Sequence, residues 1–178
     1  MSIEDTTGYS LIQVFYGARR AQRSQVLLMN HIDEGIKILD SLEASMVTKE
    51  AFAVHPLFQA DIDLEVNWHL AKHLDPLVVL LAMEYRQVAN DFLSVKIKME
   101  ASEEAFGRCY ATQEIKLSVI PEVNQMLIAD KVQNRKDFER YHRSTHARSN
   151  QLDYYFKLWL TKLEVSEEQY SEFVKLIA

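Results

Sequence analysis

Turn-forming residues are scarce in this chain, and this scarcity is the strongest constraint on its fold. Only four glycines and three prolines occur among the 178 residues. The tight turns that connect β-strands depend on glycine, proline and small polar residues, so a sheet protein of this length needs more of them. We therefore predict an all-α fold, a helical bundle formed by a single domain over residues 1–178.

Local patterns place the predicted helices along the chain. Hydrophobic residues recur at helical spacing between Leu28 and Leu42, which is typical of a helix with one buried face. Asp75–Pro76 has the composition of a helix start, and Ser166–Gln169 has that of a capping box. Helices are predicted over about residues 9–16, running on into 18–22, and over 28–42, 48–58, 76–95, 102–116 and 151–163, with two more that begin at 121 and 166.

The net charge of −6 argues against a protein that binds extended nucleic acid. The segment from Lys131 to Arg148 is nevertheless rich in basic residues, and a local basic patch favours a compact anionic ligand.

The chain lacks an apolar run of membrane-spanning length, and its acidic N-terminus lacks the positive flank of a signal peptide. The single cysteine, Cys109, excludes an intramolecular disulfide and is interpreted as a packing residue. We expect a cytoplasmic protein whose partner is a phosphorylated small molecule.

The run from Ile128 to Arg135 carries the most informative polar residues. On a helix, Asp130 and Asn134 lie one turn apart on the same face, with Lys131 and Arg135 beside them. A carboxylate, an amide and two cations in one patch are suited to hold a metal ion and a phosphate group. This pattern predicts a ligand site on the helix that begins at Pro121.

The same run resembles the last motif of HD-domain phosphohydrolases, in particular the RelA/SpoT-type alarmone hydrolases. In that family a Leu-Ala-Asp-Lys-Leu-x-Asn-Leu/Met-Arg helix supplies the final metal aspartate. Asn30–His31 resembles the family's Asn-His-Pro helix, Ala51–Pro56 resembles its Ala-Ala-Leu-Leu-His-Asp helix, and Tyr16–Arg20 resembles the Phe-Ala-Ala-Arg-Lys of its first helix. These motifs stand in the family's order over about the first three quarters of the chain.

The resemblance implies a helical domain of the HD type with two groups of functional residues. Its metal ligands would be His31, His55 and Asp130, and two histidines with one carboxylate suit manganese, iron or zinc. The residues expected to hold a nucleotide or another phosphorylated ligand are Arg19, Lys131, Asn134 and Arg135.

Two departures from the family pattern concern the chemistry of this site. Proline follows His55 where the family has the aspartate of its His-Asp pair, and proline offers no ligand atom. Gln59–Ala60 stands where the family has a Glu-Asp pair, and glutamine cannot act as a general base. We therefore expect a degenerate site at which a divalent metal binds weakly or not at all, although three ligands can still hold an ion with open positions. Three other carboxylates are candidates to replace the lost ligand: Glu34, Asp61 and Asp63.

Two functions of different classes follow from these residues. The first is a binding module that keeps affinity for a nucleotide or another phosphorylated small molecule without the family's pyrophosphohydrolase activity. The alternative is an active metal-dependent nucleotide phosphohydrolase with a reduced His/His/Asp site, whose substrate would be a nucleotide such as the alarmone ppGpp. His142 and His146, four residues apart, are expected either to hydrogen-bond a phosphate or to pair with surface carboxylates.

Overall fold

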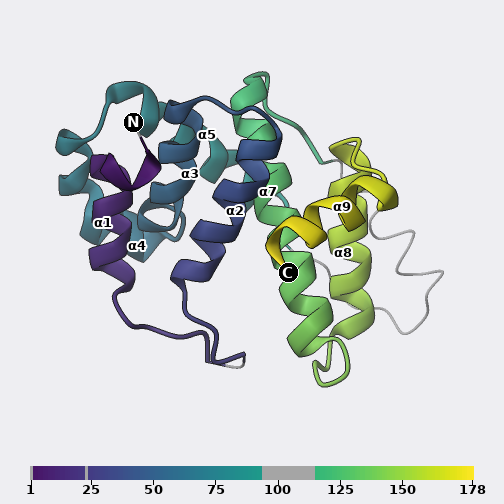
Figure 1. Ribbon diagram of the computed structural model, residues 1–178. Coiled ribbons are helices and arrows are strands. Elements are labelled where there is room, and N and C mark those ends of the chain that lie inside the picture. Colours follow the sequence, from purple (N-terminus) through teal and green to yellow (C-terminus); the bar gives the residue numbers. More distant parts are fainter. Residues whose placement is uncertain (1, 23, 94–114) are drawn as a thin grey trace.

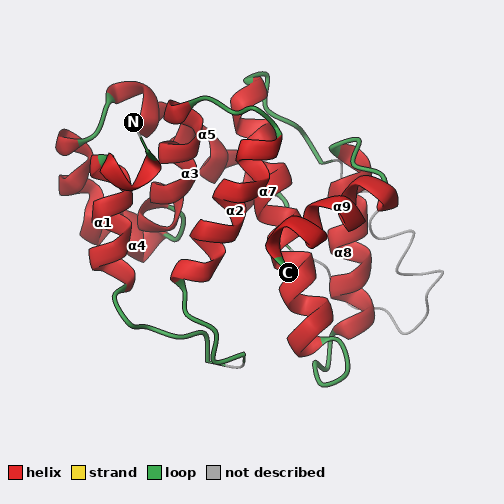
Figure 2. Ribbon diagram, in the orientation of Figure 1, coloured by secondary structure: helices red, strands yellow, loops and turns green. Residues whose placement is uncertain are grey.

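The computed structural model describes residues 2–22, 24–93 and 115–178, and every regular element in these ranges is helical (Figure 2). This confirms the predicted all-α fold. The elements are η1 (Ile3–Asp5), α1 (Thr7–Tyr16), α2 (Met29–Ser41), α3 (Met46–Phe58), α4 (Asp61–Asn67), η2 (Trp68–His73), α5 (Pro76–Asp91), α7 (Pro121–Asp137), η4 (Phe138–His142), α8 (Ser149–Lys162) and α9 (Glu167–Ile177). Of the short elements, η1 and η2 are 3-10 helices and η4 is a π-helical turn.

Side-chain caps fix two of the predicted helix starts. The carboxylate of Asp75 accepts a hydrogen bond from the backbone N–H of Leu77 at 2.7 Å, and Pro76 occupies the first turn of α5. At α9, the hydroxyl of Ser166 accepts from the N–H of Gln169, whose side chain accepts from the N–H of Ser166 in return. Because these groups satisfy N–H donors that a helix leaves open, both starts follow directly from the sequence.

The first helix is shorter than its composition predicts. It ends at Tyr16, because Gly17 adopts a positive φ of 50° that a helix cannot continue. The chain then forms a loop to α2, in which Arg20 and Leu27 make an isolated β-bridge. The sequence patterns also did not predict α4 and η2, which follow α3.

Part of the sequence prediction lies outside the described residues. This holds for Cys109, for the end of the helix predicted to reach Val95, and for most of the helix predicted over 102–116. The described end of that stretch, Ile115 and Lys116, belongs to no helix.

Among the described helices, none combines the length and the apolar character needed to cross a bilayer.

Helix α3 lies at the centre of the N-terminal part of the bundle and packs against α1, α2, α5 and α7 (Figure 1). Helix α7 packs in turn against α2, α5 and α8, and α9 contacts both α2 and α7. Buried aromatic side chains such as Phe52, Tyr85 and Trp159 fill the spaces between these helices. The junction of α2, α3 and α7 is therefore held from several sides, and it is here that the polar residues singled out in the sequence meet.

A glycine sets the distance between α2 and α3. Gly35 faces the ring of Phe52, and a Cβ atom added at Gly35 would lie only 2.2 Å from the nearest ring carbons. Phe52 also contacts the rings of His31 and His55, with centroid distances of 5.7 Å and 5.0 Å. The close approach of the two helices thus brings a histidine of α2 next to a histidine of α3.

Gly35→Ala should destabilise the protein by about 1–3 kcal/mol, because the added methyl group would overlap the fully buried ring of Phe52. The gain in helix propensity, about 1 kcal/mol, is too small to offset this overlap. Urea unfolding followed by circular dichroism measures the change. Lys37→Ala, at an exposed position of the same helix, is the control and should alter stability by less than about 0.5 kcal/mol. Equal unfolding midpoints for the two variants would contradict this packing.

Candidate metal centre

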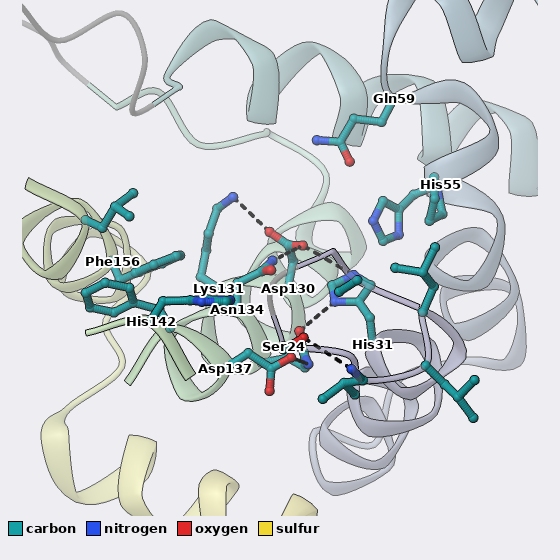
Figure 3. A pocket seen from close by; sticks show the side chains of 18 of the residues that line it. Ser24, His31, His55, Gln59, Asp130, Lys131, Asn134, Asp137, His142 and Phe156 are labelled. Carbon is teal, nitrogen blue, oxygen red and sulfur yellow. Dashed lines mark hydrogen bonds and ion pairs between the residues drawn. The ribbon is translucent and has the colours of Figure 1, made fainter. Parts of the chain in front are cut away.

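A pocket of about 530 Å³ opens between α2, α3, α7 and α8, and polar side chains from each of the first three helices line it (Figure 3). Its polar lining residues are Tyr16, Ser24, His31, His55, Gln59, Asp130, Lys131, Gln133, Asn134, Asp137, His142 and His146. The pocket therefore collects residues that lie more than one hundred positions apart in the sequence.

Three of these residues form a group that can hold a metal ion. His31 of α2, His55 of α3 and Asp130 of α7 each offer one ligand atom, and these atoms lie within 4.8 Å of one another. A tetrahedral ion with bonds of about 2.1 Å needs ligand atoms roughly 3.4 Å apart, and His31 Nε2 lies 3.6 Å from Asp130 Oδ1. The prediction that these three side chains converge is confirmed, and the group could hold a metal ion.

The ring of His55 is buried, neutral and held in one orientation. Burial, together with a smaller effect of nearby His31, lowers the pKa of His55 to about 3. Its Nδ1 lies 2.6 Å from the carbonyl oxygen of Phe52. In a regular helix that carbonyl would accept from the N–H of residue 56, but Pro56 has no N–H to donate. His55 therefore donates its Nδ1–H to Phe52, and the lone pair of its Nε2 remains available to a ligand.

Asp130 is a buried carboxylate with several partners. Its Oδ2 accepts from Lys131 Nζ and its Oδ1 accepts from Asn134 Nδ2, each at 2.8 Å (Figure 3). Burial alone would raise the pKa of Asp130, but Lys131, His31 and His55 outweigh it and lower the pKa to about 2. Asp130 is therefore charged at neutral pH, as a metal ligand must be.

Lys131 is the internal counter-ion of Asp130. Burial alone would lower the pKa of Lys131, but the carboxylate of Asp130 raises it well above its ordinary value. The ammonium group also lies 5.0 Å from the ring centroid of Trp159 and 5.7 Å from that of Tyr155, within the range of cation–π attraction. One side of the carboxylate thus faces a fixed cation from α7, and the other faces the histidines.

The structure brings only two of the four predicted phosphate-binding residues to the pocket. Lys131 and Asn134 line it, whereas Arg19 and Arg135 do not. Arg135 follows Asp130 by five residues, which is roughly 140° around a helix. Its guanidinium makes a paired contact with Glu167 at 2.9 and 2.8 Å and stacks on the ring of Tyr170 at 3.9 Å. It fixes α9 to α7.

Arg19 lies beyond the end of α1 and is exposed. Its guanidinium stacks on Phe15 at 4.5 Å and bonds to the backbone carbonyls of Phe15 and Tyr16. The sequence resemblance placed this arginine at the site, but the loop that starts at Gly17 directs it to the side of α1. Arg19 itself does not line the pocket, although its partner Tyr16 does.

None of the three substitute carboxylates lines the pocket. Glu34 pairs with Lys136 at 2.5 Å and accepts from Gln133, and Asp61 bonds to Arg86 at the exposed start of α4. Among the described residues, these three carboxylates therefore do not take the place of the aspartate that the HD family has where this chain has Pro56.

Two features of the pocket were not assigned from the sequence. The first is Gln133, which bonds to His31 and is almost fully buried. Its spacing of three residues from Asp130, which places both on the same helix face, is the sequence signal that could have indicated it. The π-helical turn η4 follows α7 directly, and π-helical turns are frequent at functional sites. Its last residue, His142, lies in the pocket wall together with His146.

The burial of neutral His55 makes stability depend on pH. In the unfolded chain His55 binds a proton below about pH 6.5, whereas in the folded chain its ring stays unprotonated down to about pH 3. Stability from this group is therefore complete above pH 6.5 and is lost as the pH falls, by roughly 4–5 kcal/mol over the full window. The lowered pKa of Asp130 acts in the same direction, but only as the pH falls from about 3.8 to about 2.

His55→Gln should therefore flatten the loss of stability between about pH 6.5 and pH 4.5, measured by urea unfolding at a series of pH values. His69→Gln is the matched control. His69 also points its Nδ1 at the carbonyl three residues earlier, Val66, at 2.9 Å, but it is exposed and should leave the pH dependence unchanged. A pH dependence that is identical in the wild type and both variants would refute the burial of a neutral imidazole at position 55.

Protein-family models, curated proteins and solved structures were each compared with the chain, and none matches it. The relationship to HD-domain phosphohydrolases therefore stays a prediction that rests on the sequence motifs. The geometry adds one fact that is independent of family: residues from three helices converge on a position that can hold a metal ion.

Proposed function

We propose that this protein binds a phosphorylated small molecule through a divalent ion held by His31, His55 and Asp130, and that it does so without efficient turnover. The single observation that carries the proposal is the convergence of these three ligand atoms in a pocket of about 530 Å³. Two histidines and one carboxylate suit manganese, iron or zinc, and a three-ligand site leaves positions open for a phosphate oxygen. An HD-type relationship is consistent with this arrangement and is part of the proposal.

The charges around the pocket make the ion necessary for anion binding. Lys131 is paired with Asp130, and Lys136 is paired with both Glu34 and Asp137. These cations are already compensated, so they offer a phosphate little additional attraction. An ion with two positive charges, bound to two neutral imidazoles and one carboxylate, would restore a net positive charge at the base of the pocket. The ion and the phosphorylated ligand should therefore strengthen each other's binding.

The residues around the proposed ion favour binding over turnover. Gln59 lines the pocket and cannot take up a proton near neutral pH. Asp137 also lines it, but its carboxylate oxygens are engaged by Gln133 at 2.9 Å and by Lys136 at 3.0 Å. A metal-bound water would need a base placed to accept its proton, and neither side chain is suited to that role.

The alternative is an active metal-dependent nucleotide phosphohydrolase, and one observation favours it. His142 and His146 both lie in the pocket wall. Histidine can exchange a proton near neutral pH, so either residue is chemically able to serve a reacting phosphate. The two functions share the ion and differ only in whether the phosphate bond is broken.

Calorimetry with Mn²⁺, and separately with ppGpp, GTP and ATP, tests the proposal. Mn²⁺ alone and nucleotide alone should bind weakly, and each should bind at least about tenfold more tightly when the other is present. His31→Gln should remove this enhancement, whereas His69→Gln, at an exposed position, should retain it. A nucleotide that binds equally well without metal, and equally to His31→Gln, would refute an ion-dependent site. Metal-dependent release of phosphate or pyrophosphate that disappears in His31→Gln would establish the hydrolase alternative.

Lys131→Met offers a second test of the ion. The substitution leaves Asp130 as a buried charge without its counter-ion, which should destabilise the metal-free protein by about 3–5 kcal/mol. A divalent ion would supply the missing positive charge, so Mn²⁺ or Zn²⁺ should stabilise this variant more than the wild type. Thermal unfolding with and without the metal measures the difference. If saturating metal stabilises neither protein, Asp130 and Lys131 form only an internal ion pair.

A further inference from the structure

Gln133 makes a set of contacts behind the candidate metal centre that its sequence position alone does not reveal. It lies on α7 with only 1% of its surface exposed. Its side-chain oxygen Oε1 lies 2.6 Å from His31 Nδ1. Its side-chain nitrogen Nε2 lies 3.0 Å from Glu34 Oε2 and 2.9 Å from Asp137 Oδ2. One amide therefore connects a histidine and a carboxylate of α2 with a carboxylate of its own helix.

These contacts leave the amide only one orientation. An ionised carboxylate accepts hydrogen bonds and cannot donate them, so the NH₂ group of Gln133 must face Glu34 and Asp137. Lys136 donates to Glu34 at 2.5 Å and lies 3.0 Å from Asp137, so both carboxylates also face a cation. Reversing the amide would direct its oxygen at two carboxylates and lose both hydrogen bonds. The oxygen is thereby directed at His31.

The fixed oxygen determines where the proton of His31 resides. An amide oxygen can only accept, so His31 Nδ1 carries the proton and donates it to Gln133. In the neutral form of the ring the lone pair is then on Nε2, and Nε2 lies 3.6 Å from Asp130 Oδ1. His55 has the same arrangement, since its Nδ1 donates to the carbonyl of Phe52. In both histidines Nε2 is thus the ring nitrogen left for a ligand, and both residues belong to the same group as Asp130.

We propose that Gln133 is the positioning residue of this site, which holds His31 in the tautomer that presents Nε2 to a metal ion. This inference rests on the proposed metal-binding function and adds to it the residue that prepares the ligand. Partners that fix the tautomer of a metal-bound histidine typically change metal affinity by 10–100-fold when removed. Gln133 would act on the ion through His31.

The tautomer can be measured without any metal. Nitrogen-15 NMR of the metal-free wild type at mildly alkaline pH should show His31 protonated at Nδ1. Gln133→Met, which keeps the length of the side chain but removes the acceptor, should shift the population toward protonation at Nε2. A wild-type spectrum in which His31 is protonated mainly at Nε2 would overturn the assignment of Gln133. That result would leave the proposed function open to its own test.

Metal affinity provides the second readout. Gln133→Met should bind Zn²⁺ and Co²⁺ about 10–100-fold more weakly than the wild type. Gln125→Met is the matched control, because Gln125 lies on the same helix and donates to the carbonyl of Leu42 rather than to a site residue. It should bind metal as the wild type does. If Gln133→Met, shown to be folded by circular dichroism, also keeps wild-type metal affinity, Gln133 does not position His31.

Gln133→Glu separates positioning from general packing. The carboxylate still accepts from His31 Nδ1, but it cannot donate to Glu34 and Asp137, so three carboxylates would face one another. This variant should be less stable than the wild type and yet bind metal more tightly than Gln133→Met. Equal metal affinity of the two variants would indicate that the amide matters only for packing and would overturn the proposal.

Discussion

The buried carboxylate of Asp130 is the interaction around which the centre of this structure is arranged. A charge removed from water must be compensated, and here the compensation comes from several elements. Lys131 and Asn134 of α7 each hold one carboxylate oxygen, and His31 of α2 faces it. The ammonium group of Lys131 makes cation–π contacts in turn with the rings of Tyr155 and Trp159 of α8. The packing of α2, α7 and α8 is thus coupled to the ionisation of one side chain.

Pro56 affects the candidate metal group through the backbone N–H that it lacks. Where the HD-family motif that Ala51–Pro56 resembles has an aspartate, proline offers no ligand atom. Because Pro56 has no N–H, the carbonyl of Phe52 accepts a hydrogen bond from the ring of His55 instead. A histidine with its Nδ1–H engaged presents Nε2 as a ligand atom. The hydrogen bond to Phe52 therefore orients the ring of His55 within the candidate metal group.

The helical fold could be predicted from the sequence because its signals are local. Asp75–Pro76 and Ser166 mark helix starts through bonds within a few residues, and the structure places both where expected. The convergence of His31 with Asp130 was predicted only through the order of family-like motifs. Gln133 could not be assigned from the sequence, since its role depends on Glu34, a residue 99 positions away on another helix. The prediction for Arg135 treated its proximity in sequence to Asp130 as a shared helix face, whereas in the structure its guanidinium bonds to Glu167.

The basic segment after Asp130 shows that charge pairing between distant residues also cannot be predicted from the sequence. Counted along the sequence, it is a positive patch that favours anions. In the structure, Arg135 is bound by Glu167, Lys136 by Glu34, and Arg143 by Asp153. Opposite charges so close together cancel most of the field that a phosphate would experience. An anion in this pocket would then need a charge that these side chains do not already compensate. His31, His55 and Asp130, at the junction of α2, α3 and α7, form a group that could hold such a charge as a metal ion.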